Sequence, residues 1–574
     1  MRTLHLNKGK GKNLKNKFLV LDVETNGLNA NPENFIFCCL YSFDNALFFY
    51  KVDEIKKELL KAKYRNKIVF VHFAEFDLNV IYRNIITGLD NAAIYSGSNF
   101  ICATNGNVKF ADSLNIYKTS VKNIVESIGL KKIDIEQSYL KGNVKKITDN
   151  MLIYCKRDCE IVFEGLLSIF NFVGSVKITL ASLSLALFKN KYLKYNIEYE
   201  PTYTDLFRKS YYGGRTEVFK IGKCNANYYD INSMYPFCML KNFPNPKKFK
   251  VEKNISVKRF LSLIEFYEGV ANIELLHEDH YFGFLPVKNE NKLLFPTGNI
   301  KGWYNLNEIR FALENNVIKI KKIHEIYYSP QIMLSPFNQF VTDLYKIKNE
   351  SEGITKYNAK ILMNSLYGKF AEKDSTIKTY YENLPVNLIQ KYDILDIPYK
   401  IHLFNKIRND CYIEVATEKG KNKSHQIPLF SSYITSYARI ELLKYLLKYK
   451  ECEPLYCDTD SIFFNKLPDI KDSTEIGLFK REKEIITKIY GLKDYEYKKD
   501  DDDKIYKKIK GIPLKNATQI NTNNYSFKAM IKSKQSLRRN NKTGNHILIT
   551  KNLTRNYNKR KILTNFGTMP IKLT

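Results

Sequence analysis

The chain lacks the patterns that mark secreted and membrane-spanning proteins. No apolar run approaches the ~20 residues that a transmembrane helix needs. The basic opening segment leads into a short apolar run at residues 18–21, too short for a signal peptide. An organelle-import segment is the alternative, but the segment is not rich in Arg or Ser, so we expect a solvated basic arm. The ten cysteines include no C-x-x-C pair, which argues against a disulfide framework and a zinc site; Cys155 and Cys159, one helical turn apart, are interpreted as core thiols. We expect a reduced, intracellular protein without membrane contact.

Acidic residues are missing from the end of the chain. No Asp or Glu follows Asp503, and over the 574 residues 91 Lys and Arg outnumber 60 Asp and Glu, a net charge of +31. This excess implies a polyanionic partner, either nucleic acid or an acidic membrane surface. The apolar content of "HILITKNL" and "MPIKL" favours a folded acid-free region over a disordered tail. The run "KKDDDDK" at residues 498–504 is expected to be a solvated hairpin tip and not a metal cluster.

The remaining composition is that of a globular protein, with 44% hydrophobic and 26% charged residues. This length suffices for several domains and a large core. No internal repeat and no linker rich in Pro, Gly or Ser divides the chain. Composition therefore leaves function open, and carboxylates in apolar settings become the informative features.

The first group of such carboxylates lies before residue 160. Asp22 and Glu24 alternate on a predicted strand and therefore project from one face. Asp77 follows an apolar run and a histidine, and Tyr154 and Asp158 share one face of a predicted helix. Taken singly, each is explained by a turn, a cap or a surface charge. Together, four carboxylates can hold two divalent metals of the kind that hydrolyse phosphodiesters, with the tyrosine orienting water.

The second group joins two distant segments. Asp230 ends an apolar strand in "YYDINSMYP", and Asp458 and Asp460 flank Thr459 in "YCDTDSIFF". Burying neighbouring carboxylates is costly, so either the pair at Asp458 and Asp460 sits on a solvated turn or a strongly positive group meets it there.

A helix between these segments carries polar groups on one face. In "KYNAKILMNSLYGKF", the residues at spacings i, i+4, i+7 and i+8 are Lys360, Asn364, Tyr367 and Gly368. A lysine here suits a triphosphate, and tyrosine with glycine suits a stacked base pair. The alternative is a helix end capped by Gly368.

These motifs resemble those of family B DNA polymerases, in particular the protein-primed branch of phages, viruses and linear organellar plasmids. "DINSMYP" resembles D-x-x-S-L-Y-P, "KILMNSLYG" resembles K-x-x-x-N-S-x-Y-G, and "YCDTDS" resembles Y-x-D-T-D-S. "SYYGG", "TSYAR" and "KDY" resemble Y-x-G-G, T-x-x-A-R and K-x-Y, with Lys504 and Tyr506 of "KIY" as rivals for the last. The resemblance covers nearly the whole chain. One departure is Phe73, where the family usually has Asn after the histidine, which predicts weaker or differently balanced proofreading.

The resemblance implies an α+β and α/β multidomain fold. A ribonuclease H-like 3′→5′ exonuclease domain would precede a right-hand polymerase of palm, fingers and thumb with two insertions. The expected ranges are exonuclease 1–185, palm 186–240 and 430–515, first insertion 241–335, fingers 336–370, second insertion 371–429 and thumb 516–574. The first insertion would contact a terminal protein. The second, with a predicted hairpin at residues 380–392, would serve processivity and strand displacement.

The resemblance also implies a role for each matching side chain. The catalytic residues would be Asp230, Asp458, Asp460 and Lys360 for synthesis, and Asp22, Glu24, Asp77, Asp158 and Tyr154 for degradation. The nucleotide would contact Ser233, Met234, Tyr235, Lys348, Lys356, Lys360, Asn364, Tyr367 and Gly368. DNA would contact Thr25, Phe76, Ser113, Leu114, Tyr211, Gly213, Gly214, Thr435, Arg439, Thr459, Lys493 and Tyr495. Two Mg²⁺ per centre, replaceable by Mn²⁺, would be bound by Asp230 and Asp458 and by Asp22, Glu24, Asp77 and Asp158.

The expected activity is addition of dNTPs to a primer 3′-hydroxyl on a DNA template, with proofreading, by a virus- or plasmid-encoded monomer. Any terminal protein is expected to be a distinct chain. Two alternatives stay open. A reverse transcriptase also uses a Y-x-D-D-like hairpin, but "DTD" and the exonuclease group argue against it. A non-catalytic DNA-binding relic would explain the charge but not the paired carboxylates.

Overall fold

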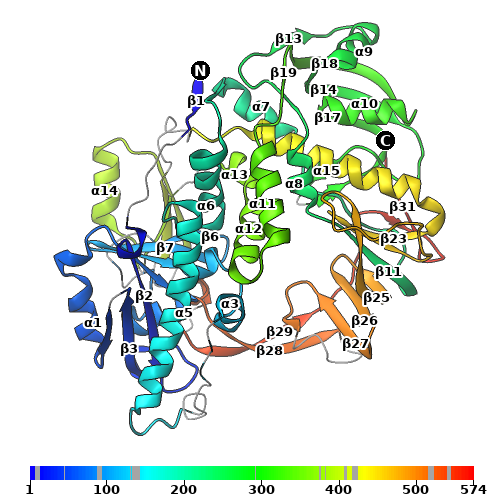
Figure 1. Cartoon of the computed structure of the whole chain (residues 1–574). Helices are drawn as coiled ribbons and strands as arrows, with labels where there is room; N and C mark the ends of the chain where they lie inside the picture. The colour runs from blue at the N-terminus through cyan, green and yellow to red at the C-terminus, as the bar shows by residue number, and fades with distance from the viewer. Residues whose placement is uncertain are drawn as a thin grey trace.

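The structure is a computed structural model, shown in Figure 1. It describes residues 1–6, 13–43, 45–86, 89, 93–129, 131, 133, 142–290, 292–373, 377–381, 383–405, 410–415, 424–514, 523–539 and 544–574. Among the helices of these ranges, none combines the length and apolar character needed to cross a membrane.

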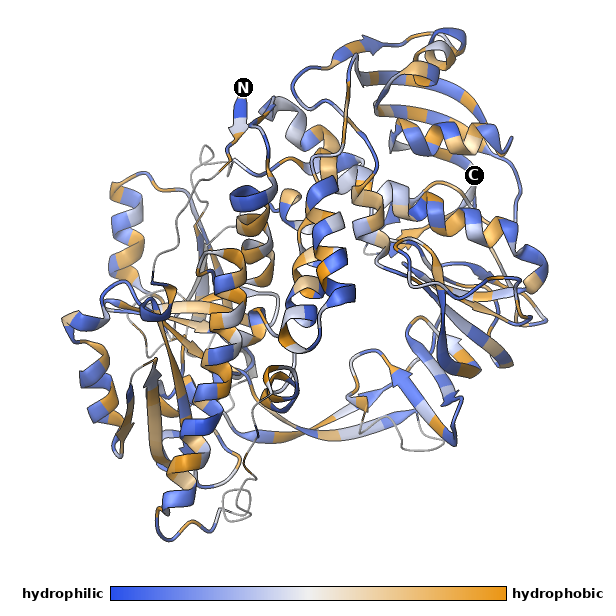
Figure 2. Ribbon diagram, viewed as in Figure 1, coloured by the Kyte–Doolittle hydropathy of each residue, from blue (hydrophilic) through white to orange (hydrophobic). Residues whose placement is uncertain are grey.

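The N-terminal domain is built on a seven-stranded mixed sheet of order β4-β3-β2-β5-β8-β7-β6. Its strands are β2 (Phe18–Thr25), β3 (Phe35–Ser42), β4 (Asn45–Phe49), β5 (Ile68–Val71), β6 (Ile94–Ser96), β7 (Asn99–Asn105) and β8 (Val108–Asp112). The three central strands β2, β5 and β8 are parallel. Most of their residues are apolar and buried, as expected of parallel strands covered on both faces, and strands of this domain are largely orange in Figure 2. Their carboxyl ends consequently share one edge of the sheet.

Helices cover this sheet and lead to the next domain. They are α1 (Val52–Leu59), α2 (Ala74–Tyr82), α3 (Val121–Ile128), α5 (Asp149–Val173) and α6 (Leu180–Leu187). Helix α5 begins where the Thr148 hydroxyl accepts a hydrogen bond from the Met151 N–H, and it ends at Gly174 in the left-handed region (φ 75°). It packs on β2 and β3, which places its functional face beside the end of β2.

The palm is an antiparallel seven-stranded sheet of order β10-β23-β24-β11-β25-β26-β27. The strands are β10 (Thr216–Val218), β11 (Gly222–Ile231), β23 (Pro454–Asp458), β24 (Ser461–Phe464), β25 (Phe479–Gly491), β26 (Asp494–Lys499) and β27 (Asp502–Ile509). Helices α8 (Met234–Met239) and α15 (Pro428–Lys448) pack together, and α15 runs beside the sheet (Figure 1). The β26–β27 turn confirms the predicted hairpin tip within residues 498–504.

Three helices form the fingers: α11 (Asn338–Glu350), α12 (Gly353–Ser365) and α13 (Tyr367–Phe370). The first insertion is a five-stranded sheet of order β13-β18-β14-β17-β32 with α9 (Val257–Phe266) and α10 (Leu306–Glu314). Its strands are β13 (Lys250–Lys253), β14 (Glu268–His277), β17 (Thr297–Asn305), β18 (Ile318–Ser329) and β32 (Lys572–Leu573).

The second insertion corrects one expectation. Its three-stranded sheet pairs β22 (Asp410–Val415) with β20 (Ile377–Tyr381) and β21 (Tyr399–Asn405). The predicted hairpin at residues 380–392 is wrong in its second half, which forms helix α14 (Val386–Ile394) directly after Pro385. Short apolar patterns do not separate strand from helix, and proline before a helix is a common start.

The N-terminal arm corrects a second expectation. Arg2–Leu4 forms β1, which pairs with β9 (Ile197–Tyr199), and Leu4 is fully buried. Residues 2–4 are therefore not a solvated arm; the basic residues 7–12 lie outside the described part of the chain.

The acid-free region is folded wherever it is described. Strands β28 (Asn524–Met530) and β29 (His546–Asn552) form a long hairpin that reaches from the palm to the N-terminal domain (Figure 1). At its tip, Lys532 pairs with the buried Glu75 at 3.3 Å. Residues 553–574, which the sequence assigned to the thumb, instead return to the palm, and β32 joins the sheet of the first insertion.

Candidate active sites

The palm brings Asp230 and Asp458 to the two sides of one residue. Asp230 on β11 is paired with Ser461, and Asp458 on β23 is paired with the same Ser461. Paired residues on neighbouring strands project from the same face, so both carboxylates face one side, about 10 Å apart at Cα from two strand spacings. Asp460 lies next to Asp230, because the Asp460 carbonyl accepts a hydrogen bond at 2.7 Å from the N–H of Ile231, the residue after Asp230.

This group is electrostatically incomplete without a cation. Burial, followed by the charges of Asp460 and Glu482, raises the pKa of Asp230 to about 7 against smaller opposing contributions from Lys480 and Lys360. Burial, with Asp458 nearby, likewise raises the pKa of Asp460 to about 6. Carboxylate oxygens are the donors that Mg²⁺ and Mn²⁺ prefer, and a divalent charge would restore the ionised state of both groups. The residues present therefore fit the expected metal.

Asp458 already makes three contacts. Its carboxylate accepts hydrogen bonds from the Tyr456 hydroxyl at 3.2 Å and from Thr459 Oγ1 at 3.2 Å. Lys493 Nζ lies 3.2 Å from Asp458 Oδ2 and is half exposed. Tyr495, the other member of this K-x-Y element, packs edge-on against Phe463. Lys493 thus lies at the carboxylates, whereas its rival Lys504 lies on β27, the outermost strand.

The turn that joins the two aspartates is held in an unusual conformation. Thr459 has φ 66°, which is rare for a β-branched residue. Its N–H donates to the carbonyl of Arg215 at 2.7 Å. A Cβ on Gly214 would come within 2.9 Å of the Thr459 side chain and 3.1 Å of the Tyr235 hydroxyl. The Y-x-G-G loop therefore packs directly on the turn, and only glycine fits there.

The predicted nucleotide residues gather at the meeting point of palm and fingers. Tyr235 on α8 stacks on Tyr367 on α13, with ring centroids 4.3 Å apart. The pKa of Lys348 is lowered by burial and by the neighbouring charges of Lys360 and Lys356, which places the three lysines together.

The other four residues predicted to bind the nucleotide differ in their exposure and in their contacts. Ser233 precedes α8 at φ 52°, and Asn364 donates to the Lys360 carbonyl at 3.0 Å. Gly368 lies inside α13 with open space around it, so the alternative of a capping glycine is wrong. The Met234 side chain is 1% exposed in the core, and its contact with a nucleotide stays a prediction.

The T-x-x-A-R element lies in the interior. Thr435 and Arg439 are 1% and 3% exposed, and their contact with DNA stays a prediction. Arg439 donates to the carbonyls of Tyr212 and Gly213, at 2.7 and 2.9 Å, and pairs with Glu308 at 2.8 Å. It holds the Y-x-G-G loop, in which Tyr211 is half-buried and Gly213 is exposed, in contact with the turn from Asp458 to Asp460.

The second centre lies where the parallel strands of the N-terminal sheet end. Asp22 and Glu24 lie on β2, and Asp77 on α2 accepts a hydrogen bond from the Val23 N–H at 2.8 Å. Asp22, Glu24 and Cys155 each offer a ligand atom within 4.8 Å of the others. The thiol of Cys155 donates to the Asp22 carbonyl at 3.7 Å, so the interpretation of Cys155 as a core thiol omitted its place behind this centre.

These carboxylates also repel one another. Burial raises the pKa of Asp22 well above its ordinary value, and Glu24, Asp77 and Asp158 raise it further. Burial raises the pKa of Asp77 to about 8. The pKa of Tyr154 is raised by burial and then by Asp158, Glu24 and Asp22, so the phenol lies near all three carboxylates. The donor set again suits divalent cations held by oxygen ligands.

Sequence reasoning missed Asp112 at this centre. It ends β8, the third parallel strand, and accepts hydrogen bonds from the N–H groups of Phe73 and Leu114 at 3.1 and 2.9 Å. Burial raises its pKa to about 6. The available signal was its position at the end of an apolar strand beside the S-L element. Phe73, which it anchors, has φ 66° and is 36% exposed.

Two predicted DNA contacts are buried beside this centre. Ser113 is fully buried and hydrogen-bonds His72 Nδ1 at 2.8 Å, and Thr25 is 6% exposed with its hydroxyl donating to the Gly27 carbonyl at 2.8 Å. Both side chains shape the loops around the centre, and their contact with DNA stays a prediction. Phe76 and Leu114 are half-buried and stay predictions.

Comparison with known proteins gives a consistent result. The family model described as DNA polymerase type B, organellar and viral, matches residues 126–449, more than half of the chain. A probable DNA polymerase of Podospora anserina is 31% identical over 415 residues, which are 65% of this chain and 33% of the relative. The DNA-directed DNA polymerase of Enterobacteria phage PRD1 is 25% identical over 360 residues, 61% of this chain and 60% of the relative.

Solved structures show the same fold. Phi29 DNA polymerase complexed with primer-template DNA and incoming nucleotide substrates matches with a TM-score of 0.69 at 20% identity, covering 94% of this chain and 100% of that chain. This match confirms the predicted multidomain α/β fold. The chain spans about a third of the length of the fungal relatives, 33%, 39% and 30% of three of them.

Proposed function

The chain belongs to the organellar and viral type B DNA polymerases, and from this premise we propose that it is a template-directed DNA polymerase with a 3′→5′ exonuclease. One observation carries the proposal. Asp230 and Asp458 face the same side of the palm across Ser461, with the pKa of Asp230 raised to about 7. Carboxylates in this state attract divalent cations, and the second carboxylate group, at Asp22 and Glu24, does the same in a separate domain.

The roles of the protein's own groups follow from their positions. Asp230 and Asp458 would hold two Mg²⁺, and when bound these supply the charge that acidifies the primer 3′-hydroxyl and stabilises the leaving pyrophosphate. Lys360, with Lys348 and Lys356 beside it, binds the triphosphate from the fingers. Tyr235 lies under the sugar, Tyr367 supports it by stacking, and Lys493 reaches the primer end from beside Asp458.

Degradation uses the N-terminal centre. Asp22, Glu24, Asp77 and Asp158 would hold the cations, and Tyr154 orients the attacking water with its phenol. Phe73, exposed at the same edge, contacts the frayed primer end in place of asparagine. The basic hairpin β28–β29 grips phosphates without reading sequence.

The biological setting belongs to the same proposal. Relatives from a phage and from fungi suggest replication of a viral or plasmid genome, with initiation on a terminal protein that contacts the first insertion. The reverse transcriptase alternative predicts extension on an RNA template, which the proposal does not.

The direct test offers the purified chain a primed circular single-stranded template with Mg²⁺ and dNTPs, without clamp or helicase. The proposal predicts products longer than one template circumference, and removal of dNTPs should convert the primer into shorter fragments. Absence of any extension from a folded chain would overturn the polymerase assignment. Extension on RNA but not on DNA would favour the alternative.

A further inference from the structure

The C-terminal segment, residues 555–574, lies along the outer edge of the palm strand β10. Strand β10 has three residues and stands at the edge of the sheet, where a strand of this length is weakly held. The segment supplies its missing partners. The Tyr557 hydroxyl accepts from the Val218 N–H at 3.0 Å, Thr568 Oγ1 donates to the Val218 carbonyl at 2.7 Å, and Lys559 Nζ donates to Thr216 Oγ1 at 2.7 Å.

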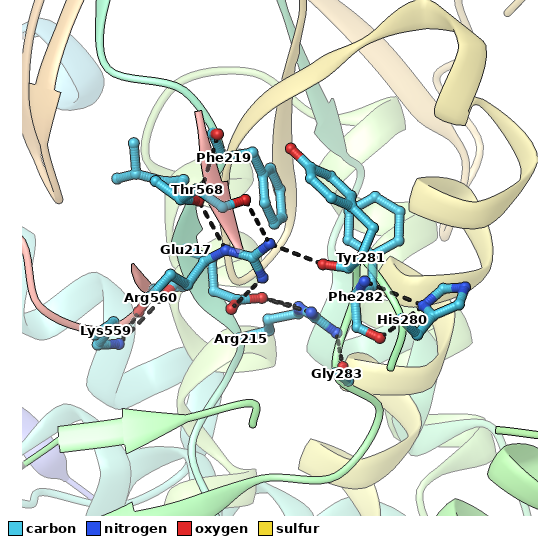
Figure 3. A network of polar contacts seen from close by, with 12 residues as sticks. Arg215, Glu217, Phe219, His280, Tyr281, Phe282, Gly283, Lys559, Arg560 and Thr568 are labelled. Carbon is cyan, nitrogen blue, oxygen red and sulfur yellow. Dashed lines mark hydrogen bonds and ion pairs between the residues drawn. The ribbon is translucent and has the colours of Figure 1, made fainter. Parts of the chain in front are cut away.

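A buried ion network fixes this contact (Figure 3). Glu217 lies between two guanidinium groups: Arg215 Nε donates to Glu217 Oε2 at 2.6 Å, and Arg560 Nη1 donates to Glu217 Oε1 at 3.0 Å. The three residues are 1%, 1% and 2% exposed. Burial opposes ionisation of Glu217, but Arg215 and Arg560 outweigh it, so its pKa is lowered. Removing one member of such a group leaves an uncompensated buried charge.

The network also binds the first insertion to the palm. Arg560 Nη2 donates to the Tyr281 carbonyl at 2.8 Å, and Arg215 Nη1 donates to the Gly283 carbonyl at 2.8 Å (Figure 3). Three segments far apart in sequence therefore meet at this network. Arg560 is their common donor from the end of the chain.

Strand β10 and the residue before it hold the turn from Asp458 to Asp460 in place. The carbonyl of Arg215 accepts the N–H of Thr459 at 2.7 Å, and Thr216 is paired with Asp458. A threonine at φ 66° is strained, and such a conformation persists only where its surroundings determine it. The position of β10 is thus part of what holds Asp458 and Asp460 in register.

We propose that Arg560, acting through Glu217 and Arg215, is a positioning residue of the polymerase centre. It fixes β10 from its outer edge and thereby the turn from Asp458 to Asp460. This inference rests on the proposed polymerase function. It assigns a catalytic consequence to a residue that contacts neither nucleotide nor DNA.

The experiment compares Arg560→Met with Lys561→Met, a matched control that removes an exposed cation from the next position. Arg560→Met should lower kcat for nucleotide addition by about 10- to 100-fold, the usual cost of misplacing a reacting group by about 1 Å. The Mg²⁺ concentration for half-maximal extension should rise. The KM for dNTP should change less than about twofold, and so should the rate of single-strand degradation by the N-terminal centre. Lys561→Met should match wild type in kcat, KM and Mg²⁺ requirement.

A triple variant, Arg215→Met with Glu217→Leu and Arg560→Met, distinguishes a loss of positioning from a loss of stability. Apolar replacement of a whole buried ion group commonly preserves stability. The proposal predicts that this variant recovers the wild-type Tm but keeps the low kcat and the raised Mg²⁺ requirement. Recovery of kcat together with Tm would overturn it. If the Tm of the triple variant stays low, a second variant decides. Thr568→Val removes only the hydroxyl that bonds Arg560 and Val218, and it should lower kcat at a temperature where the chain is folded. An unchanged kcat in Thr568→Val would overturn the proposal.

Failure of this inference is distinguishable from failure of the proposed function. A wild-type chain that does not extend a primer overturns the function. A wild-type chain that extends, with Arg560→Met equal to it in kcat and Mg²⁺ requirement, overturns only the positioning role.

Discussion

Tyr235 and Tyr367 stack with their ring planes 24° apart, and this pair joins the palm helix α8 to the fingers helix α13. The Tyr235 hydroxyl lies against Gly214, whose absent side chain leaves it room. The ring of Tyr235 is therefore fixed from two sides at the expected sugar position. A fixed ring can exclude an added hydroxyl, whereas a mobile one cannot.

Substituting Tyr235→Ala should weaken the discrimination against ribonucleotides by about 10- to 100-fold, because the excluded volume under the sugar is lost. The measurement is the ratio of kcat/KM for a dNTP and the matching rNTP. Tyr235→Phe keeps the ring and should retain the ratio. An unchanged ratio in Tyr235→Ala would show that another group reads the sugar.

The pKa of Asp230 predicts a pH-dependent stability. Burial raises this pKa from 3.8 to about 7, so the folded state holds the proton more tightly than the unfolded state does. Stability from this group is fully present below pH 3.8 and is lost as pH rises through 7. In EDTA, the Tm advantage of Asp230→Asn over wild type should therefore grow between pH 5 and pH 8.

Added Mg²⁺ should remove that advantage at pH 8, because only the wild-type carboxylate binds the cation. Asp458→Asn, measured alongside, should also lose Mg²⁺-dependent stabilisation. A pH-independent Tm difference between Asp230→Asn and wild type would contradict the predicted burial of this carboxylate.

Phe73 stands in a backbone conformation, φ 66°, that asparagine tolerates better than phenylalanine. Phe73→Asn should raise the free energy of unfolding by about 0.5–1 kcal/mol, and it should speed degradation of a frayed primer end. Thermal unfolding and single-strand degradation measure the two effects. Phe73→Ala is the control, since it removes the ring without the asparagine side chain; an equal effect of both variants would assign the change to loss of the ring.

The salt dependence of DNA affinity distinguishes Lys493 from Lys504 as the residue that contacts the primer. Each phosphate contact contributes about 0.9 to the slope of log affinity against log salt concentration. Lys493→Ala should therefore reduce the slope for primer-template DNA by about 1, whereas Lys504→Ala, on the outer strand β27, should leave it unchanged. The reverse outcome would transfer the primer contact to Lys504 and Tyr506.

The carboxylates of both centres were predictable because local periodicity determines where they point. Asp22 and Glu24 share a strand face, Tyr154 and Asp158 share a helix face, and the two-residue turn after Asp458 limits Asp460. Their convergence in space needed the family resemblance, since no local pattern joins β2 to α5 or β11 to β23.

The burial of several predicted site residues could not be read from the sequence, because it depends on tertiary contacts. The partners of Arg439, Glu308 and the Tyr212 carbonyl, are distant in sequence, and together they bury it. The return of residues 553–574 to the palm could not be read from an acid-free pattern, because Arg560 is distinguished from its basic neighbours only by the buried Glu217. Charge patterns predict a polyanionic partner but not which cations stay inside.

The central claim is that two separate carboxylate groups perform synthesis and degradation. The most direct measurement is nucleotide addition and single-strand degradation by Asp458→Ala and by Asp22→Ala with Glu24→Ala, each shown to be folded. The account predicts that the first variant loses addition and keeps degradation, and that the second does the reverse. Loss of both activities in both folded variants would contradict it.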